Sequence, residues 1–415
     1  MINDFINYIK ERGYFNQCTD ENGLKKLNKN ELIAYTGFDC TADSLHIGSL
    51  VQIMMLRSLQ KFGLKPIILL GGGTTLIGDP SGKDKTRKIL TKETIDANKA
   101  KFKKIFEKFL IFNNSLSSAI IVDNYEWLSK LNYINFLRDI GSQFSVNRML
   151  GFDSIKLRLE REQNLSFLEF NYVIFQAYDF LQLNKTFNCN LQLGGSDQWG
   201  NIISGIDLVK KINGNKKIYG LTSPLITNSK GEKMGKTNQG AIWLTEDKLS
   251  AFDYWQFWRN TEDKDVIIFL KLFTELENSR IEKLADYKGS DLNEVKILLA
   301  NEATKICHGE KKAKQAEINS KNIFLRNENL DSSISEKNKF IFKLNQKINL
   351  KELLVKLNLA NSSSEAKRLI INGGVKLNEI KISDKNFLLT KSDFKEKKEL
   401  KISVGKKKHG IIKAE

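Results

Sequence analysis

Histidine and cysteine are scarce in this sequence, with three and four copies among 415 residues. The cysteines, Cys18, Cys40, Cys189 and Cys307, have no paired spacing, and three scattered histidines cannot complete a recognisable zinc cluster. We therefore expect plain buried thiols in a reducing compartment and predict no metal site.

Long apolar runs are also missing. The first residues, MINDFINYIKERG, are partly acidic and lack the apolar core of a signal peptide, and no segment approaches the length of a membrane span. With 41% hydrophobic residues the chain can still bury a full core, split into two or three domains. These features predict a soluble, cytoplasmic protein with no membrane partner.

Two common nucleotide-binding motifs are absent from the glycine-rich segment GGGTTLIGDPSGK. A Walker A loop would need a glycine where Ile77 stands and a serine or threonine where Asp84 follows Lys83. The glycine spacing of a dinucleotide fingerprint fails as well, because Leu76 occupies its third position.

Positive charge is abundant, and it is concentrated near the C-terminus. The whole chain carries a net charge of +17, and residues 346–415, with 17 Lys and Arg against 8 Asp and Glu, contribute +9 of it. Such a basic module attracts polyanions, nucleic acid above all.

The first half of the chain alternates between strand and helix patterns. Buried strands are predicted over 31–38, 65–73 and 119–128, and an amphipathic helix over 45–63 with Asp43 or Ser44 as its N-cap. This alternation predicts an α/β fold, a Rossmann-like parallel sheet that binds ligands at the carboxyl ends of its strands.

The second half changes character twice. From about Leu221 the pattern is helical, and after a polar linker two short helices (350–360 and 362–370) and one alternating strand (375–382) follow. We predict a catalytic domain at 1–220, a helical domain at 221–320, a linker at 321–345 and a small α+β RNA-binding domain at 346–415.

His46, in DCTADSLHIGSL, lies at the predicted start of the first long helix, with no base or carboxylate spaced to form a catalytic triad. A helix N-terminus attracts phosphate, a neutral imidazole can donate an N–H to it, and Gly48 leaves room for a flat ring. A lone histidine is more often satisfied within a core, so the neighbouring motifs have to decide.

A polar stripe runs along the segment FNYVIFQAYDF. Tyr172, Gln176 and Asp179 follow at i, i+4 and i+7, on one face of a helix whose other faces are largely apolar. The stripe is either the solvent-facing side of an ordinary amphipathic helix or a set of polar groups that need a partner inside the protein.

Five segments in order resemble the blocks of one enzyme family. YTGFDCTADSLHIGSL and PLITNSKGEKMGKT are similar to the paired HIGH and KMSKS signatures of class I aminoacyl-tRNA synthetases. Together with GGGTTLIGDPSGK, EFNYVIFQAYDF and LQLGGSDQWGNI they resemble tyrosyl-tRNA synthetases of the bacterial type, and the basic C-terminal module is similar to the RNA-binding fold that ends many of these enzymes.

The resemblance implies two transfers at one site: ATP activates L-tyrosine, and the tyrosyl group then passes to tRNA(Tyr). It places Asp179 and Tyr35 at the substrate phenol, where phenylalanine would leave them unpaired. It further places Tyr172, Gln176 and Asp79 around the α-ammonium group, with Gln192 at the pocket edge.

For ATP, a substrate that brings Mg²⁺ with it, the resemblance implies no covalent nucleophile and no tightly bound cofactor. Five residues are expected to stabilise the polyphosphate or order the loop around it: Thr41, His46, Lys233, Lys236 and Thr237. Five others are expected to lie along the adenosine and the adenylate: Asp39, Gly48, Ser49, Asp197 and Gln198.

RNA contacts are expected from two parts of the chain. Lys83 and Arg87 either contact the acceptor stem, as the resemblance suggests, or form a solvated basic turn. In the last domain, basic residues on two helices and a strand around Gly373 fit an RNA backbone binder: Lys351, Lys356, Lys367, Arg368, Lys376 and Lys381. The resemblance also implies a homodimer.

Three positions depart from the family's usual pattern. Ser49 replaces the second histidine of HIGH, Gly235 replaces the first serine of KMSKS, and Thr36 stands where some relatives have cysteine. Two alternatives stay open: a tryptophanyl-tRNA synthetase, which shares fold and signatures, and a non-catalytic RNA-binding descendant of a synthetase.

Overall fold

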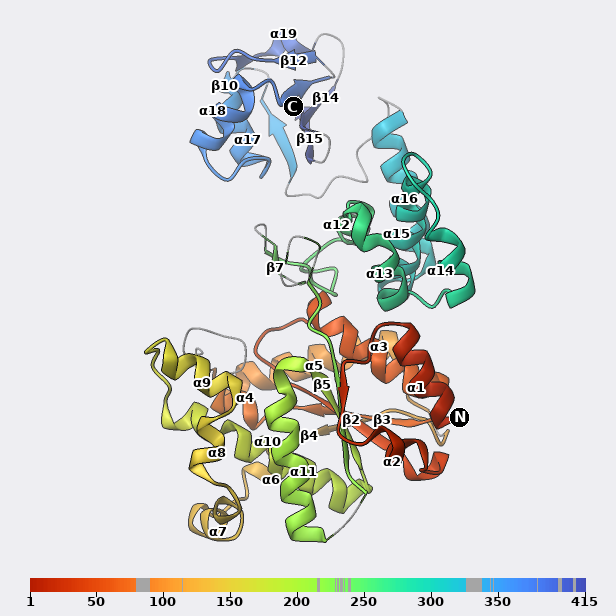
Figure 1. The fold of residues 1–415 in the computed structure, drawn as a ribbon. Helices are drawn as coiled ribbons and strands as arrows, with labels where there is room; N and C mark the ends of the chain where they lie inside the picture. Colours follow the sequence, from red (N-terminus) through yellow and green to blue (C-terminus); the bar gives the residue numbers. More distant parts are fainter. Residues whose placement is uncertain are drawn as a thin grey trace. The chain divides into compact units, whose positions relative to one another are not determined.

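The computed structural model describes residues 1–79, 90–113, 115–214, 217–227, 229, 231, 234, 236–237, 240–325, 338–343, 345, 347–378, 380–394, 398–405 and 408–415, without the side chains of 153–154, 236–237, 240 and 323–325. The chain forms two compact units, one of Met1–Leu249 and Phe257–Glu310, the other of Ser250–Gln256 and Lys311–Glu415 (Figure 1).

A six-stranded sheet organises the first unit, in the order β1-β6-β5-β2-β3-β4. All neighbours pair in parallel except β1 and β6. The strands are β1 (Gln17–Cys18), β2 (Ile33–Phe38), β3 (Lys65–Leu70), β4 (Ile120–Asp123), β5 (Leu191–Gly195) and β6 (Tyr219–Ser223). The parallel sheet confirms the predicted fold class, and the strand order reverses between β2 and β5, where such sheets bind ligands.

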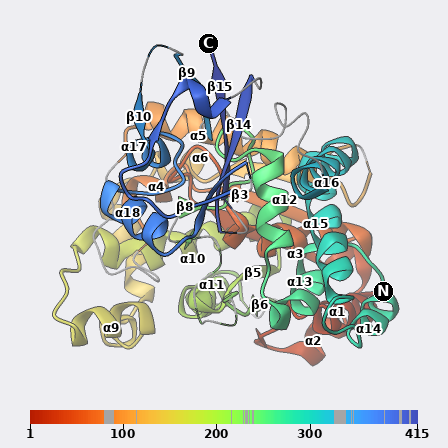
Figure 2. The same ribbon diagram turned by 90° about the horizontal axis from the view of Figure 1, so that it is seen from above.

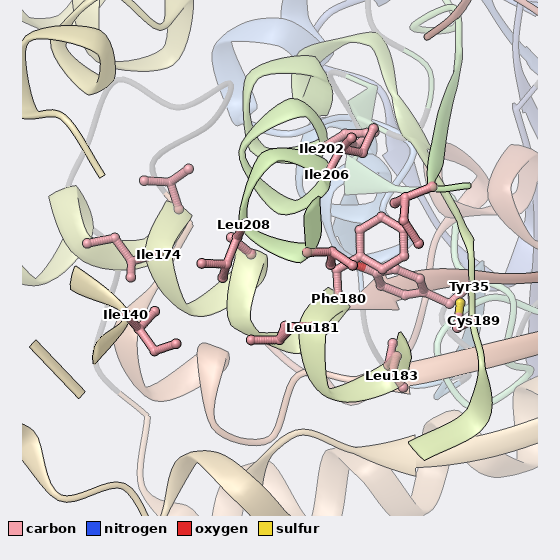
Figure 3. Close-up of a cluster of buried hydrophobic side chains, with 14 of the residues drawn as sticks. Tyr35, Ile140, Ile174, Phe180, Leu181, Leu183, Cys189, Ile202, Ile206 and Leu208 are labelled. Atoms are coloured by element: carbon pink, nitrogen blue, oxygen red, sulfur yellow. The ribbon is translucent and has the colours of Figure 1, made fainter. Parts of the chain in front are cut away.

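Helices cover the sheet in two groups. The crossover helices α3 (Ile47–Lys61) and α5 (Lys92–Phe109) contact each other, and α10 (Phe167–Phe187) packs along α11 (Trp199–Asn213) (Figure 1). A buried cluster with members from β2, β3, α10 and α11 forms the core between sheet and helices, and Figure 3 shows Tyr35 beside Phe180 and Cys189 within it.

Shorter helices complete the sheet region of the first unit: α1 (Ile2–Glu11), α2 (Glu21–Lys25), α4 (Thr74–Ile77), α6 (Tyr125–Leu128), α7 (Tyr133–Asp139), α8 (Val146–Leu150) and α9 (Asp153–Glu160). No helix in the described ranges is both long enough and apolar enough to cross a bilayer.

The start of α3 differs from the prediction. His46, and not Asp43 or Ser44, is the N-cap, because its Nδ1 accepts a hydrogen bond from the Gly48 amide at 3.0 Å. Asp43 is bound instead by the amines of Lys101 and Lys248 at 2.8 Å, and these hydrogen bonds lower its pKa to about 2.

The sheet also extends past the predicted change at residue 221, because β6 runs to Ser223 and pairs with β5. The helical part follows, with α12 (Ala251–Arg259), α13 (Val266–Phe273), α14 (Asn278–Leu284), α15 (Leu292–His308) and α16 (Glu310–Leu325).

The C-terminal part of the second unit has its own sheet, in the order β12-β11-β14-β15-β9, and its own apolar core. Its elements are β9 (Lys339–Phe342), β10 (Ile348–Asn349), α17 (Leu350–Lys356), α18 (Ser363–Ile371), β11 (Val375–Leu377), β12 (Ile380–Ile382), β13 (Leu388–Leu389), α19 (Lys391–Phe394), β14 (Glu399–Val404) and β15 (Lys408–Ala414). This α+β architecture is the predicted one.

Two details of this part differ from the prediction. The strand expected over 375–382 is a hairpin, since Asn378 adopts a φ of 45° and β11 turns back into β12. The predicted linker 321–345 contains β9, which pairs in parallel with β15, so the sheet begins before residue 346.

Candidate active site

A cavity of about 310 Å³ opens at the carboxyl ends of β2 and β5, where the strand order reverses. The segments that line it come from β2, β3, β5 and β6, the start of α3, and α10. Eleven residues singled out in the sequence meet there: Tyr35, Asp39, Gly48, Ser49, Asp79, Tyr172, Gln176, Asp179, Gln192, Asp197 and Gln198.

Asp179 is the buried carboxylate of this cavity, with only 1% of its surface exposed. Its Oδ1 accepts a hydrogen bond from the Trp127 indole at 2.7 Å, and its Oδ2 accepts one from the Asn124 amide at 2.8 Å. Burial raises the pKa of Asp179 to about 8, against the opposing effect of these two donors. Each carboxylate oxygen still has a lone pair for a further donor.

Tyr35 and Gln192 carry polar atoms that are buried without a hydrogen-bond partner in the described parts of the chain: the Tyr35 hydroxyl and the Gln192 Oε1. The Tyr35 ring packs on Phe180 at 5.2 Å between centroids (Figure 3). Burial and the nearby Asp179 charge raise the pKa of Tyr35 well above its usual value. Buried polar groups of this kind are costly unless a ligand satisfies them.

A chain of side-chain amides links the residues predicted for the ammonium group and for ATP. The Gln198 Nε2 donates to Asp79 at 3.1 Å, and its Oε1 accepts from Gln176 at 3.3 Å. Asn201 donates to both glutamines, at 2.9 and 3.1 Å. Asp79, Gln176 and Gln198 therefore belong to one polar wall.

A second chain of hydrogen bonds surrounds Asp39 at the end of β2. The Tyr172 hydroxyl donates to its Oδ2 at 3.0 Å, and the Thr74 hydroxyl donates to its Oδ1 at 2.7 Å. A Cβ at Gly71 would lie 2.2 Å from Asp39 Oδ1, so only glycine fits there. Gly71 of the glycine-rich segment thus leaves room for the Asp39 carboxylate, and this explains the glycine without a phosphate-binding loop.

The start of α3 is joined to the chain that follows the lysine-rich segment. The Ile47 amide donates to the Ile242 carbonyl at 3.0 Å, and the Leu244 amide donates to the Leu45 carbonyl at 2.9 Å. His46 is therefore half-buried, and an isolated antiparallel β-bridge pairs it with Trp243, which follows the lysine-rich segment. Its Nδ1 accepts from Gly48, which puts the proton of the neutral ring on Nε2.

The remaining predicted residues are placed as follows. Thr41 is exposed, and neither it nor His46 lines the cavity. A Cβ at Gly48 would meet the His46 ring at 2.7 Å and the Met234 carbonyl at 3.0 Å, so this glycine is already required by its protein neighbours.

The predicted lysines lie largely outside the described structure. Lys236 and Thr237 form β7, which pairs with β8 (Gly240–Ala241), and the structure describes their backbone but not their side chains. Lys83, Arg87 and Lys233 lie outside the described residues.

Asn124, Trp127 and Thr74 were not singled out in the sequence, although they hold Asp179 and Asp39. Asn124 also accepts the Gly73 amide at 2.7 Å and thereby joins β4 to the glycine-rich turn. Polar residues directly after the buried strand AIIV were the available signal. In the described ranges no three His, Cys, Asp or Glu side chains gather as a metal site.

Comparison with known proteins shows the family of this chain. The family described as tRNA synthetases class I (W and Y) matches residues 27–325, and the tyrosine--tRNA ligase SYY-like C-terminal domain matches residues 336–412. The chain belongs to the tyrosine–tRNA ligase family. As a member it is a class I aminoacyl-tRNA synthetase.

Individual relatives span almost the whole chain. The tyrosine--tRNA ligase of Wolbachia sp. subsp. Brugia malayi is 52% identical over 409 residues, covering 98% of this chain and 97% of its own. That of Pelagibacter ubique is 52% identical over 412 residues, covering 98% of both chains. A C-terminally truncated mitochondrial tyrosyl-tRNA synthetase of Aspergillus nidulans is 30% identical with a TM-score of 0.69, covering 77% of this chain and 94% of its own.

Proposed function

We propose that this tyrosine–tRNA ligase works by two displacements in the described cavity. A carboxylate oxygen of L-tyrosine attacks the α-phosphorus of ATP, the bond to the β-phosphate oxygen breaks, and pyrophosphate leaves. A terminal ribose hydroxyl of tRNA(Tyr) then attacks the tyrosyl carbonyl and releases AMP. The observation that carries the proposal is the buried Asp179 next to the Tyr35 hydroxyl, which has no hydrogen-bond partner among the described residues, a pair that a substrate phenol satisfies.

We assign the tyrosine contacts from this pair outwards. The phenol donates to Asp179 and accepts from Tyr35. The α-ammonium donates to Asp79 and Gln176 of the polar wall and to the Tyr172 hydroxyl, with Gln192 at the pocket edge. Support comes from their common cavity and hydrogen-bonded network. An indole lacks the para hydroxyl, so this arrangement favours tyrosine over tryptophan.

MgATP is assigned to the side of the cavity formed by Asp39, Gly48, Ser49, Asp197 and Gln198, all of which line it. His46, Thr41, Lys233, Lys236 and Thr237 then act on the polyphosphate as negative charge moves to the leaving pyrophosphate. The Nε2–H of His46 at the start of a long helix supports this role. Either the Ser49 hydroxyl, which lines the cavity, or the lysines take over the share of the second imidazole.

The experiment that tests the proposal is exchange of radiolabelled pyrophosphate into ATP with each aromatic amino acid. We expect tyrosine-dependent exchange, with phenylalanine and tryptophan weaker by about 10⁴-fold or more, because neither has the para hydroxyl that would bind the Tyr35 hydroxyl and a remaining lone pair of Asp179. Equal exchange with the three amino acids would refute the specificity. No exchange with any of them would favour the non-catalytic alternative.

The C-terminal sheet is proposed to bind the tRNA backbone. Lys376 and Lys381 are exposed and directly opposite in the β11–β12 register, so two positive charges lie on the same side of this hairpin, where a phosphate backbone could meet them. Lys351, Lys356, Lys367 and Arg368 on α17 and α18 are assigned to the same function, and Lys83 and Arg87 to the acceptor stem.

A chain that ends at Leu325, and so lacks β9 to β15, should separate the two reactions. We expect tyrosine-dependent exchange to change little, and tRNA charging at limiting tRNA to fall by about 10²-fold, since many phosphate contacts are lost. The full chain with Lys376→Glu and Lys381→Glu is the matched variant that keeps the fold, and its charging should become more sensitive to salt. Unchanged charging by both variants would exclude this domain as an RNA arm.

An exposed apolar surface on α7 to α10 supports a homodimer. Its members are Tyr133, Ile134, Leu137, Val146, Leu150, Leu157, Leu159, Phe167 and Leu168. Several of them line an open groove of about 690 Å³. Surfaces of this kind mark protein interfaces. We also assign the catalytic domain to residues 1–220, the catalytic lysine-rich loop and the anticodon-side contacts to 221–320, and RNA binding to the domain after the linker. The reaction is assigned to the cytoplasm, where tRNA is charged.

A further inference from the structure

Asp265 stands at the N-cap position of α13, yet its carboxylate does not cap that helix. Its Oδ2 accepts instead two hydrogen bonds from Ser229, one from the amide at 3.0 Å and one from the hydroxyl at 3.1 Å. Asp265 is only 5% exposed, so its charge is largely removed from water. A buried carboxylate directed to a segment 36 residues earlier in the chain needs an explanation beyond helix capping.

Helix α13 is itself held in place at several points of the first unit. It packs against α3, and both views show the two helices side by side (Figures 1 and 2). At its other end the Tyr14 hydroxyl donates to the Leu272 carbonyl, and the buried Arg12 guanidinium donates to the Thr274 carbonyl and, at 2.7 Å, to the Leu276 carbonyl. The helix is thus a fixed support for the residues bound to it.

Ser229 lies where the chain enters the lysine-rich segment that follows β6, four positions before Lys233. Further on, the Met234 amide donates to the Ile226 carbonyl at 2.8 Å, and Ile242 accepts from Ile47 at the start of α3. The chain around the lysine-rich segment is therefore closed on itself between Met234 and Ile226, bound to α3 through Ile242 and bound to α13 through Ser229.

We propose that Asp265 is a positioning residue for tyrosine activation. By holding Ser229 it fixes the entry of the lysine-rich segment to the same support that carries α3, so that the lysines and His46 reach the polyphosphate of ATP together. Asp265 acts through Ser229 and touches no substrate. This inference rests on the proposed function of the lysines, and it adds a residue that the signature motifs do not contain.

The expected loss of rate depends on how far the lysines move when the Asp265–Ser229 contact is removed. Misplacing a charge-stabilising group by about 1 Å reduces a rate by roughly 10²-fold. Tyrosine binds in the cavity between β2, β5 and α10, and none of the residues that line it belongs to α13. Loss of the Asp265 contact should therefore slow the chemical step and weaken ATP binding while sparing tyrosine affinity.

The test compares Asp265→Ala with Asp265→Asn, Ser229→Ala and the control Asp263→Ala in the full chain. Asp263 lies in the same turn, its side chain is 72% exposed, and it pairs with Lys296. Pyrophosphate exchange gives kcat and the KM for ATP, equilibrium dialysis gives the Kd for tyrosine, and thermal melting reports the fold.

We expect Asp265→Ala to lower kcat by about 10- to 100-fold. Asn, which keeps an acceptor oxygen, should recover part of the loss, and Ser229→Ala should lose less than Asp265→Ala because its amide still donates. Adding Ser229→Ala to Asp265→Ala should cost nothing further, since the contact is already gone. Asp263→Ala and the tyrosine Kd of all variants should stay within about twofold of the unchanged chain.

The proposal is overturned if Asp265→Ala retains the unchanged kcat, or if kcat and tyrosine affinity fall together, as they would if the residue only supported the fold. If the unchanged chain shows no tyrosine-dependent exchange, the proposed function itself fails, which is a separate outcome.

Discussion

Asp179→Asn is expected to lower kcat/KM for tyrosine in pyrophosphate exchange by about 10²- to 10³-fold, while the slow reaction with phenylalanine changes much less. Both oxygens of the carboxylate already accept hydrogen bonds, from Trp127 and Asn124. An asparagine amide offers an oxygen to only one of these donors, and its own N–H groups face the other donor or the substrate phenol. The discrimination of about 10⁴-fold or more against phenylalanine is a value known for tyrosyl-tRNA synthetases as a family, and it does not come from the geometry of this site.

Two variants delimit this effect. Tyr35→Phe removes a hydroxyl but leaves the acceptor, so its loss should be smaller, about tenfold. Asp139→Asn changes an exposed carboxylate of α7, 57% accessible and paired with Arg138, in the same chemical way and should leave exchange unchanged. If Asp179→Asn reduces the reactions of tyrosine and phenylalanine by the same factor, the carboxylate supports the fold and does not read the phenol.

The raised pKa of Asp179, about 8, also predicts how tyrosine binding depends on pH. At pH 7 the empty site holds a proton on this carboxyl, whereas a phenol donates most strongly to the ionised form. Tyrosine binding must therefore release that proton. As the pH rises from about 6.5, the Kd for tyrosine should fall by up to about tenfold per pH unit, and it should level off above pH 8. Asp179→Asn should abolish this slope in an equilibrium titration.

Much of the site could be predicted from local sequence because its residues lie in short motifs at strand ends and on one helix face. The stripe Tyr172, Gln176 and Asp179 is such a case, and the structure turns all three towards the cavity. Asn124 and Trp127 could not be found in this way. They are 55 and 52 residues away from Asp179 in the sequence. The local sequence around Asn124 and Trp127 does not indicate which distant carboxylate these side chains will contact.

The fold shows the same division between local and distant information. β6 was missed because Tyr219–Ser223 is short, contains Gly220 and is buried on both faces, so it has no alternation and becomes a strand only by pairing with β5 and β1. The helix start at His46 was misplaced because Asp43 and Ser44 are better N-caps in general. Here Lys101 and Lys248 engage Asp43, and Ser44 accepts from Thr245 at 2.9 Å, so the histidine is left to cap the helix.

His46→Ala is expected to slow adenylate formation by about 10²- to 10³-fold with little change in tyrosine affinity. Alanine removes both the helix cap, which the structure shows, and the phosphate donor, which is proposed. Its Nδ1 caps α3 by accepting from Gly48, and its Nε2–H is the donor proposed for the phosphates. Loss of the cap alone costs about 1 kcal/mol of stability, which thermal melting would report.

Two further substitutions separate these functions. His46→Ser keeps a good N-cap but is too short to reach a phosphate, so its melting temperature should return towards that of the unchanged chain while its rate stays as low as that of His46→Ala. His46→Asn keeps the cap and an N–H donor and should recover part of the rate. If serine restored the rate, His46 would be only a helix cap and the lysine-rich segment would have to stabilise the leaving pyrophosphate alone. Because Gly48 fixes the proton on Nε2, we expect instead that the rate follows the donor and not the cap.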